Sequence, residues 1–146
     1  GHNNKIPWKA QGEQALFKRI TLNSVVIMGK NTFQSLPNGA LPERYNAVLS
    51  TDSYFEALGC FTFSNFEKAL VSMHEEFPTC EIFVIGGASL YEQTIENANE
   101  LHITRIERSF EGDAYFPKYD NDLFNLKNIE WFHTNMRYTY YHYIRK

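Results

Sequence analysis

The feature that most constrains the fold is a junction that occurs twice, in which a short apolar run stops at glycine and a helix follows. In VVIMGKNT the β-branched run from Val25 to Met28 stops at Gly29, and in IFVIGGASLY a similar run stops at Gly86 and Gly87. Such short, continuous apolar runs are typical of strands that are buried on both faces of a parallel sheet. The two junctions therefore predict parallel strands joined by helices.

The segments around these junctions continue the alternation of strands and helices. A helix is expected over about residues 13–22, and strands over 45–49, 61–63 and 81–85. Asn31 is predicted to cap a short helix through about Leu36, and Ser64 or Asn65 to cap a helix that runs to about Glu76. Another helix should begin near Ala88.

The pattern changes in the last third of the chain, where residues 101–108, 125–132 and 137–145 form three long, mainly alternating segments. Alternation of this kind predicts antiparallel pairing. The fold class is therefore α/β, with a single, mostly parallel central sheet, an antiparallel C-terminal edge hairpin and flanking helices. A chain of 146 residues without repeats or linkers is expected to form a single domain over 1–146.

Composition excludes several classes of protein. The net charge of −3 argues against a nucleic-acid backbone as the main partner, and no apolar run approaches the roughly twenty residues of a membrane helix. Cys60 and Cys80 lack motif spacing, which favours reduced thiols in a cytosolic protein. The five histidines show no metal-ligand spacing, so no metal site is predicted.

The aromatic segment MRYTYYHYIRK leaves a second interpretation open. Tyr138 and Tyr140 on one face, with basic residues nearby, could stack single-stranded bases. An edge hairpin with one buried and one solvated side explains the same alternation, and the acidic balance of the chain favours that explanation.

Glu13 heads the apolar face of the first helix, EQALFKRITL. At helical spacing it shares this face with Leu16, Phe17 and Ile20. One interpretation is a first-turn acid that favours the positive end of the helix dipole while touching solvent. The other is a buried carboxylate that faces the N–H donors of a planar ligand.

The glycine junctions and one arginine are further candidates for ligand binding. Glycine lets the backbone approach a ligand closely, and helix N-termini present N–H groups to anions, so the two junctions could hold a pyrophosphate. The alternative is two tight turns, and the dinucleotide fingerprint GxGxxG is absent. Arg44, just before a strand, is either solvated or a bidentate partner for a ligand carboxylate.

Taken together these residues resemble the dihydrofolate reductase family, in the right order from residue 1 to residue 146. The segments that carry the resemblance are IPW, GEQALFKR, VVIMGKNT, ALPERYNAVLS, IFVIGGASLYEQ and EGDAYFP, the last with Asp113 and Phe116. Several motifs at consistent separations are far more specific than any one of them. The family's Gly-Gly peptide is cis, which the resemblance implies for Gly86 and Gly87.

The resemblance implies an NADPH-dependent oxidoreductase of one-carbon metabolism that reduces 7,8-dihydrofolate to tetrahydrofolate. Hydride would pass from nicotinamide C4 to C6 of the pterin, while a buried Glu13 favours protonation of N5 and Trp8 and Thr104 position the water network. The protein would be a cytoplasmic monomer that binds dihydrofolate and antifolate inhibitors, with neither nucleic acid nor membrane as a partner.

The resemblance also implies the residues that line the binding sites. The substrate-binding set is Ile6, Phe17, Leu36, Leu41, Arg44, Ile85 and Tyr91. The cofactor-binding set is Gly29, Lys30, Asn31, Thr32, Ser50, Thr51, Gly86, Gly87, Ala88, Ser89 and Leu90, with Ser50 and Thr51 as candidates for the adenosine 2′-phosphate.

Two departures from the family pattern stand out. The family begins about a strand earlier, so the chain is expected to lack the first strand, whose absence from the sheet would leave backbone groups unpaired. Glu13 stands where common chromosomal enzymes have Asp, which is closer to the mobile, trimethoprim-insensitive bacterial group. The alternatives are a related pterin or riboflavin-pathway reductase and a folate- or nucleotide-binding module without turnover.

Overall fold

The computed structural model describes residues 13–106, 121–133 and 137–146, apart from the side chains of residues 13, 104–106, 121, 133 and 137–139. The chain divides into two compact units. One comprises residues 17–91, and the other comprises residues 92–146 together with the first 16 residues. Two helices, α1 (Glu13–Thr21) and α4 (Ala88–Thr94), run across the boundaries between them.

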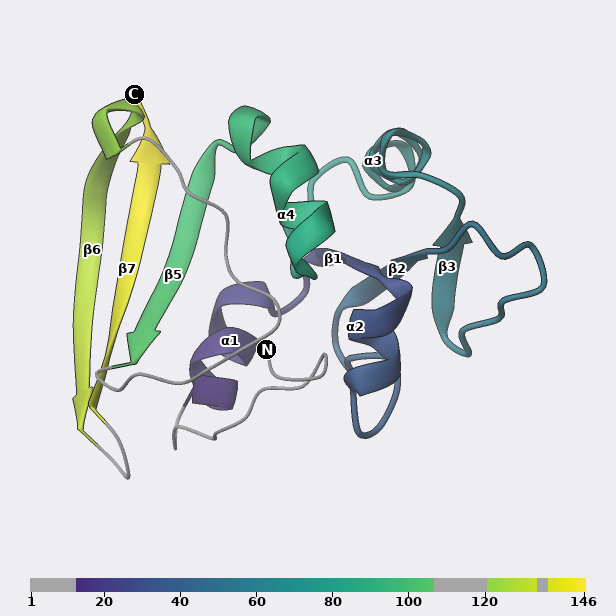
Figure 1. The fold of residues 1–146 in the computed structure, drawn as a ribbon, viewed down its shortest axis with the longest axis horizontal. Coiled ribbons are helices and arrows are strands. Elements are labelled where there is room, and N and C mark those ends of the chain that lie inside the picture. Colours follow the sequence, from purple (N-terminus) through teal and green to yellow (C-terminus); the bar gives the residue numbers. More distant parts are fainter. Residues whose placement is uncertain (1–12, 107–120, 134–136) are drawn as a thin grey trace. The chain divides into compact units, whose positions relative to one another are not determined.

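The unit of residues 17–91 contains a parallel sheet (Figure 1). Its strands are β1 (Val25–Gly29), β2 (Tyr45–Leu49), β3 (Cys60–Phe63) and β4 (Ile82–Val84), in the order β3-β2-β1-β4. All three pairings are parallel. The residues from Val25 to Met28 are completely buried, so the prediction of a buried parallel strand is confirmed.

Helices cover both faces of this sheet. Successive residues of a strand point to opposite sides, so a buried strand has side chains to pack on each face. On one face Val25 and Ile27 pack with Ala69 and Met73 of α3 (Phe66–Glu76) and with Leu90 of α4. This face carries the hydrophobic core that joins β1 to α3.

On the other face Val26 and Met28 pack with Phe33 of α2 (Lys30–Ser35) and with Leu36, which follows it. The short helix α2 leads directly out of β1, so its position is set by the end of that strand. Parallel strands covered by helices on both sides are the arrangement that the two glycine junctions predicted.

The helix starts show one confirmed cap and one wrong one. Asn65 precedes α3, and its Oδ1 accepts a hydrogen bond from the backbone N–H of Lys68 at 2.9 Å, as predicted. Asn31 does not cap α2, because the helix begins at Lys30 and Gly29 is the N-cap, without a side-chain hydrogen bond. Gly29 ends β1 in an extended conformation, so helical geometry begins two residues earlier than expected.

The second unit contains an antiparallel sheet of β5 (Glu100–Ile106), β6 (Phe124–His133) and β7 (Arg137–Arg145), in the order β5-β7-β6. Short 3-10 helices, η1 (Ile95–Asn97) and η2 (Asn121–Leu123), precede β5 and β6. The predicted antiparallel pairing is confirmed, although the described strands form a sheet of their own and not the edge of the parallel one.

The last strand of this sheet is tied to η1 by an arginine. Arg145 Nε donates to the carbonyl of Ala98 at 2.7 Å, and its Nη2 donates to that of Glu96 at 2.9 Å. The organisation of residues 1–146 as a single domain stays a prediction. None of the described helices has the length and apolar character that crossing a bilayer requires.

Candidate functional site

The two glycine junctions meet at one edge of the parallel sheet. Because β1 and β4 are parallel neighbours, their carboxyl ends lie together, and the backbone N–H of Gly29 donates to the carbonyl of Gly86 at 2.8 Å. The peptide between Gly86 and Gly87 is cis, as the resemblance implied. Gly86 has a φ of 119°, which side-chain-bearing residues rarely adopt, and an added Cβ would lie 3.4 Å from Thr32 Oγ1.

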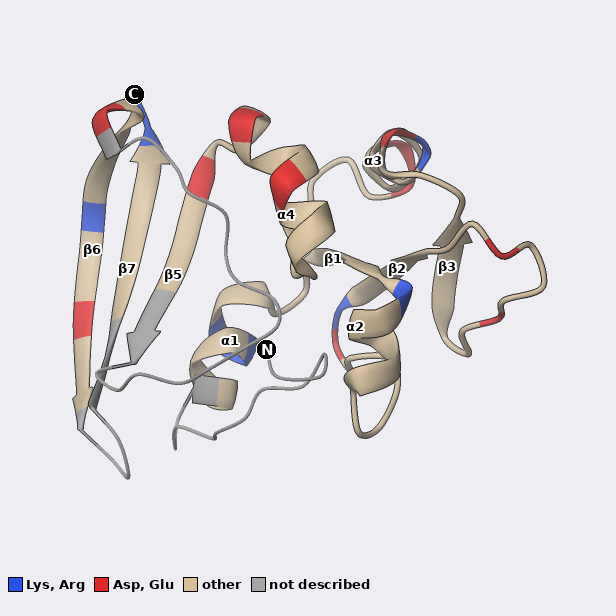
Figure 2. Cartoon of the chain, in the orientation of Figure 1, with Lys and Arg blue, Asp and Glu red and all other residues tan. Residues whose placement is uncertain are grey.

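The start of α2 provides a cation beside this edge. Lys30 Nζ lies 3.8 Å from Asp52 Oδ2 and 5.1 Å from the centroid of the Phe55 ring. The first turn of α2 carries no acid, and Figure 2 shows basic colour at its start. With the backbone of the glycine junctions nearby, this edge has the composition of a site for an anionic group.

Ser50 and Thr51 follow the end of β2, which is the next strand of the same sheet. The Ser50 hydroxyl accepts a hydrogen bond from the backbone N–H of Asp52 at 3.1 Å. The carboxylate of Asp52 therefore lies close to the residues predicted to bind a 2′-phosphate. Because Lys30 is paired with Asp52, a phosphate bound here would compete with that carboxylate for Lys30.

Arg44 is held in place by described contacts on several sides. Its Nε donates to the carbonyl of Pro42 at 2.9 Å, and its Nη1 donates to Thr21 Oγ1 at 3.2 Å. The guanidinium carbon lies 5.8 Å from the centroid of the Phe17 ring. Burial lowers the pKa of Arg44, and the adjacent Glu43 opposes that change. Within the described part of the chain Nη2 has no protein partner, which leaves a donor for a ligand.

Two buried polar residues that the sequence analysis did not single out position this arginine. The Asn46 amide donates to the carbonyls of Leu41 and Arg44 at 2.9 and 3.1 Å, and its Oδ1 accepts from the N–H of Leu41 at 2.9 Å. Thr21 is 1% exposed and donates to the carbonyl of Phe17 at 2.8 Å. An asparagine inside the apolar run YNAVL was the available signal.

The apolar candidates lie on the α2 side of the sheet or at its edge. Leu36, Leu41 and Ile85 are partly buried and pack against the cluster that contains Val26 and Met28. All three side chains therefore contact the same buried cluster, and apolar residues of this kind are expected in the wall of a ligand site.

Tyr91 lies beside Gly86 at the glycine edge, which is the edge of the sheet formed by residues 29–32 and 86–91. Its hydroxyl oxygen would lie 3.6 Å from a Cβ added to Gly86. Burial raises the pKa of Tyr91 to about 12, so the phenol stays neutral throughout the physiological range. Leu90, in contrast, places its side chain in the core beside α3.

A family model described as dihydrofolate reductase matches residues 1–145. The chain belongs to the dihydrofolate reductase family. This assignment decides in favour of the resemblance over the related pterin and riboflavin-pathway reductases.

Known dihydrofolate reductases resemble the chain along most of its length. The type A13 enzyme of Escherichia coli is 34% identical over 146 residues, which cover 100% of this chain and 87% of that protein. The enzyme of Neisseria gonorrhoeae is 39% identical over 120 residues, or 82% of this chain and 72% of that protein.

A solved structure shares the fold. Dihydrofolate reductase from Enterococcus faecalis, in complex with NADP(H) and RAB-propyl, is similar with a TM-score of 0.89 at 24% identity, covering 100% of this chain and 88% of that one. The α/β fold class is thereby confirmed.

The described residues do not include every predicted member of a dihydrofolate reductase site. Ile6, Trp8, Asp113 and Phe116 lie outside them, as do the side chains of Glu13 and Thr104. The structure brings together the candidates of the glycine edge, namely Gly29, Lys30, Asn31, Thr32, Gly86, Gly87, Ala88, Ser89 and Tyr91.

Proposed function

We propose that this protein reduces 7,8-dihydrofolate to 5,6,7,8-tetrahydrofolate with hydride from NADPH, and that Glu13 favours protonation of the pterin N5. The observation that carries the proposal is the match of the family model to residues 1–145. The reaction transfers hydride from nicotinamide C4 to pterin C6 while N5 gains a proton.

The glycine edge would bind NADPH. The backbone of Gly86, Gly87 and Ala88 would lie against the cofactor, and the positive φ of Gly86 favours glycine at this position. Lys30 would meet a phosphate and exchange its partner Asp52 for it. The hydroxyls of Thr32 and Ser89 and the amide of Asn31 add polar contacts, and Ser50 and Thr51 remain the proposed partners of the 2′-phosphate.

The substrate would lie against Phe17, Leu36, Leu41 and Ile85, with its glutamate tail at Arg44. A partly buried guanidinium with a remaining donor binds a carboxylate more strongly than a fully solvated one. Ile6 and Tyr91 complete the proposed lining.

Glu13 would hold the head of the pterin. The sequence places it on the helix face that also carries Leu16 and Phe17, and the backbone of Glu13 begins α1. A carboxylate hydrogen-bonded to the 2-amino group and N3–H stabilises the cationic, N5-protonated pterin in a dry site, where little solvent competes. The proton itself would arrive through water that Trp8 and Thr104 position.

The replacement Glu13→Gln tests this role directly. We expect hydride transfer in a single turnover at pH 7 to fall by orders of magnitude, because the amide keeps the shape and loses the charge. NADPH affinity, measured by fluorescence titration, should stay within about twofold. The matched control is Glu67→Gln, which neutralises an exposed first-turn acid on α3. A normal rate in Glu13→Gln would remove Glu13 from the mechanism.

Further properties follow from the family and from Glu13. We propose that antifolates bind at the same site. The extra methylene of Glu13 relative to Asp would shift the carboxylate and weaken the binding of trimethoprim, which would make the protein trimethoprim-insensitive. Cys60 and Cys80 are free thiols, which supports a cytoplasmic location. A monomer without nucleic-acid or membrane partners remains part of the proposal.

A further inference from the structure

Three side chains of types that can bind a metal meet on the antiparallel sheet, two of them from one strand and the third from a strand far away in sequence. Glu100 and His102 are two residues apart on β5 and therefore lie on the same face. His142 of β7 is the direct cross-strand partner of His102. Antiparallel pairing thus places three potential ligands side by side, which no spacing in the sequence indicates.

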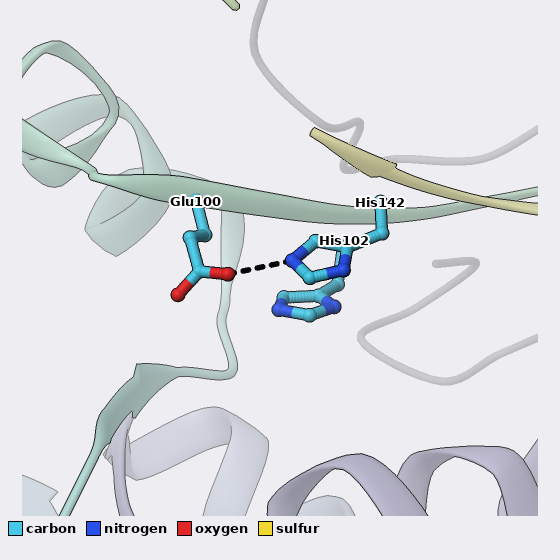
Figure 3. A group of neighbouring side chains, drawn as sticks. All are labelled: Glu100, His102 and His142. Carbon is cyan, nitrogen blue, oxygen red and sulfur yellow. Dashed lines mark hydrogen bonds and ion pairs between the residues drawn. The ribbon is translucent and has the colours of Figure 1, made fainter. Parts of the chain in front are cut away.

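Their geometry is compact. Glu100 Oε1 lies 2.6 Å from His142 Nε2, and the rings of His102 and His142 stack with centroids 4.2 Å apart and 21° between their planes. One ligand atom from each residue lies within 4.8 Å of the other two. Figure 3 shows both imidazoles directing a ring nitrogen towards the side on which the Glu100 carboxylate lies.

The distances are close to those of a metal site. Ligand atoms bind Zn²⁺ at about 2.0–2.2 Å, so two of them on one ion lie at most about 4.4 Å apart. The ligand atoms of the cluster all lie within 4.8 Å of one another, so their separations exceed that limit by at most about 0.4 Å. The side chains of His142 and Glu100 are 13% and 35% exposed, so an ion could enter from solvent and keep water on its remaining positions.

The surroundings prepare the histidines for this role. The Tyr140 hydroxyl lies 2.5 Å from His102 Nδ1 and fixes the ring, as orienting partners of metal-bound histidines commonly do. Lys127 is exposed, and its charge acts against a cation at this position.

We propose that Glu100, His102 and His142 bind one divalent transition-metal ion of the Zn²⁺ class and so tie β5 to β7. Two imidazoles and one carboxylate are a ligand set that suits Zn²⁺ and related ions. The site uses none of the residues assigned to NADPH or dihydrofolate, so it is an additional site.

The test is Zn²⁺ binding to protein freed of metal with a chelator. Isothermal titration calorimetry should show one saturable site per chain. The replacements His102→Gln and His142→Gln should each weaken that site by at least about tenfold. His74→Gln, which removes an exposed histidine of α3, is the matched control and should leave the affinity unchanged.

A second measurement uses the unaltered chain, so that a variant that fails to fold does not decide the question. In a two-dimensional imidazole NMR spectrum, adding Zn²⁺ should shift the signals of His102 and His142 together and leave those of His74 in place. Lack of saturable Zn²⁺ binding, or binding that persists in both glutamine variants, would overturn the proposal. Reduction of dihydrofolate does not enter either test.

Discussion

At the scale of single residues, described contacts hold the otherwise flexible side chain of Arg44 in one orientation. Its Nε and Nη1 are occupied by Pro42 and Thr21, and its guanidinium lies near the Phe17 ring. The loop that carries it is fastened by the buried Asn46 through three hydrogen bonds. Little side-chain entropy remains to be lost when a carboxylate binds, which strengthens the interaction.

We expect Arg44→Ala to weaken dihydrofolate binding by on the order of a hundredfold, because hydrogen bonds to charged groups contribute about 1.5–3 kcal/mol each. A small diaminopyrimidine that lacks the glutamate tail should bind almost as before. Fluorescence titration of both ligands against the same protein preparation measures the difference.

Arg44→Lys is the control for charge alone. It should recover only part of the dihydrofolate affinity, because an ammonium cannot form the paired hydrogen bonds of a guanidinium. Equal losses for dihydrofolate and the diaminopyrimidine would show that Arg44 does not bind the tail.

The neutral His102 offers a prediction on pH. The pKa of His102 is lowered from 6.5 to about 4 in the folded chain. Between these two pH values the unfolded chain therefore binds a proton on this histidine that the folded chain does not bind. In metal-free protein this contribution to stability is fully present above about pH 6.5 and is lost as the pH falls to about 4. Urea unfolding against pH should therefore show a shallower decline in His102→Phe, and an identical profile would contradict the shifted pKa.

At the scale of elements, the sequence had two candidates for the N-cap of α3, and the structure selects one. Asn65 accepts the hydrogen bond from Lys68, whereas Ser64 is exposed and precedes the cap. The cap satisfies one of the N–H groups that have no partner inside the helix. The buried Ala69 and Met73 of this helix then supply its packing against the sheet.

Replacing Asn65 with Ala should lower the free energy of unfolding by about 1 kcal/mol, the usual cost of losing such a cap. Ser64→Ala is the matched control and should have no measurable effect. Urea unfolding followed by circular dichroism gives both values. A larger loss of stability for Ser64→Ala than for Asn65→Ala would show that Ser64, and not Asn65, is the N-cap.

At the scale of the whole molecule, the chain consists of two compact units with different architectures. The proposed cofactor residues lie within residues 17–91, on the edge where β1, β2 and β4 end. The three ligands of the proposed metal site lie in the other unit. The proposed NADPH residues and the proposed metal ligands therefore belong to different sheets.

The elements themselves were predictable from the sequence because their signals are local. Continuous apolar runs indicated the parallel strands, alternation indicated the antiparallel ones, and glycine marked the end of β1 and lies two residues beyond the end of β4. The cap of α2 could not be predicted, since it depends on how far β1 extends before Gly29 leaves the strand. The role of Asn46 was also missed, because its partners become neighbours only when the loop folds over β2.

The amino-acid sequence alone determined the order of strands and helices, the glycine junctions and the family, because each depends on residues close together in the chain or on motifs in a set order. Tertiary structure alone decided that Gly29 bonds to Gly86, that Asp52 pairs with Lys30, and that His142 stacks on His102. These contacts depend on which strands are neighbours and in what register, and a shift of one residue would turn each side chain to the opposite face.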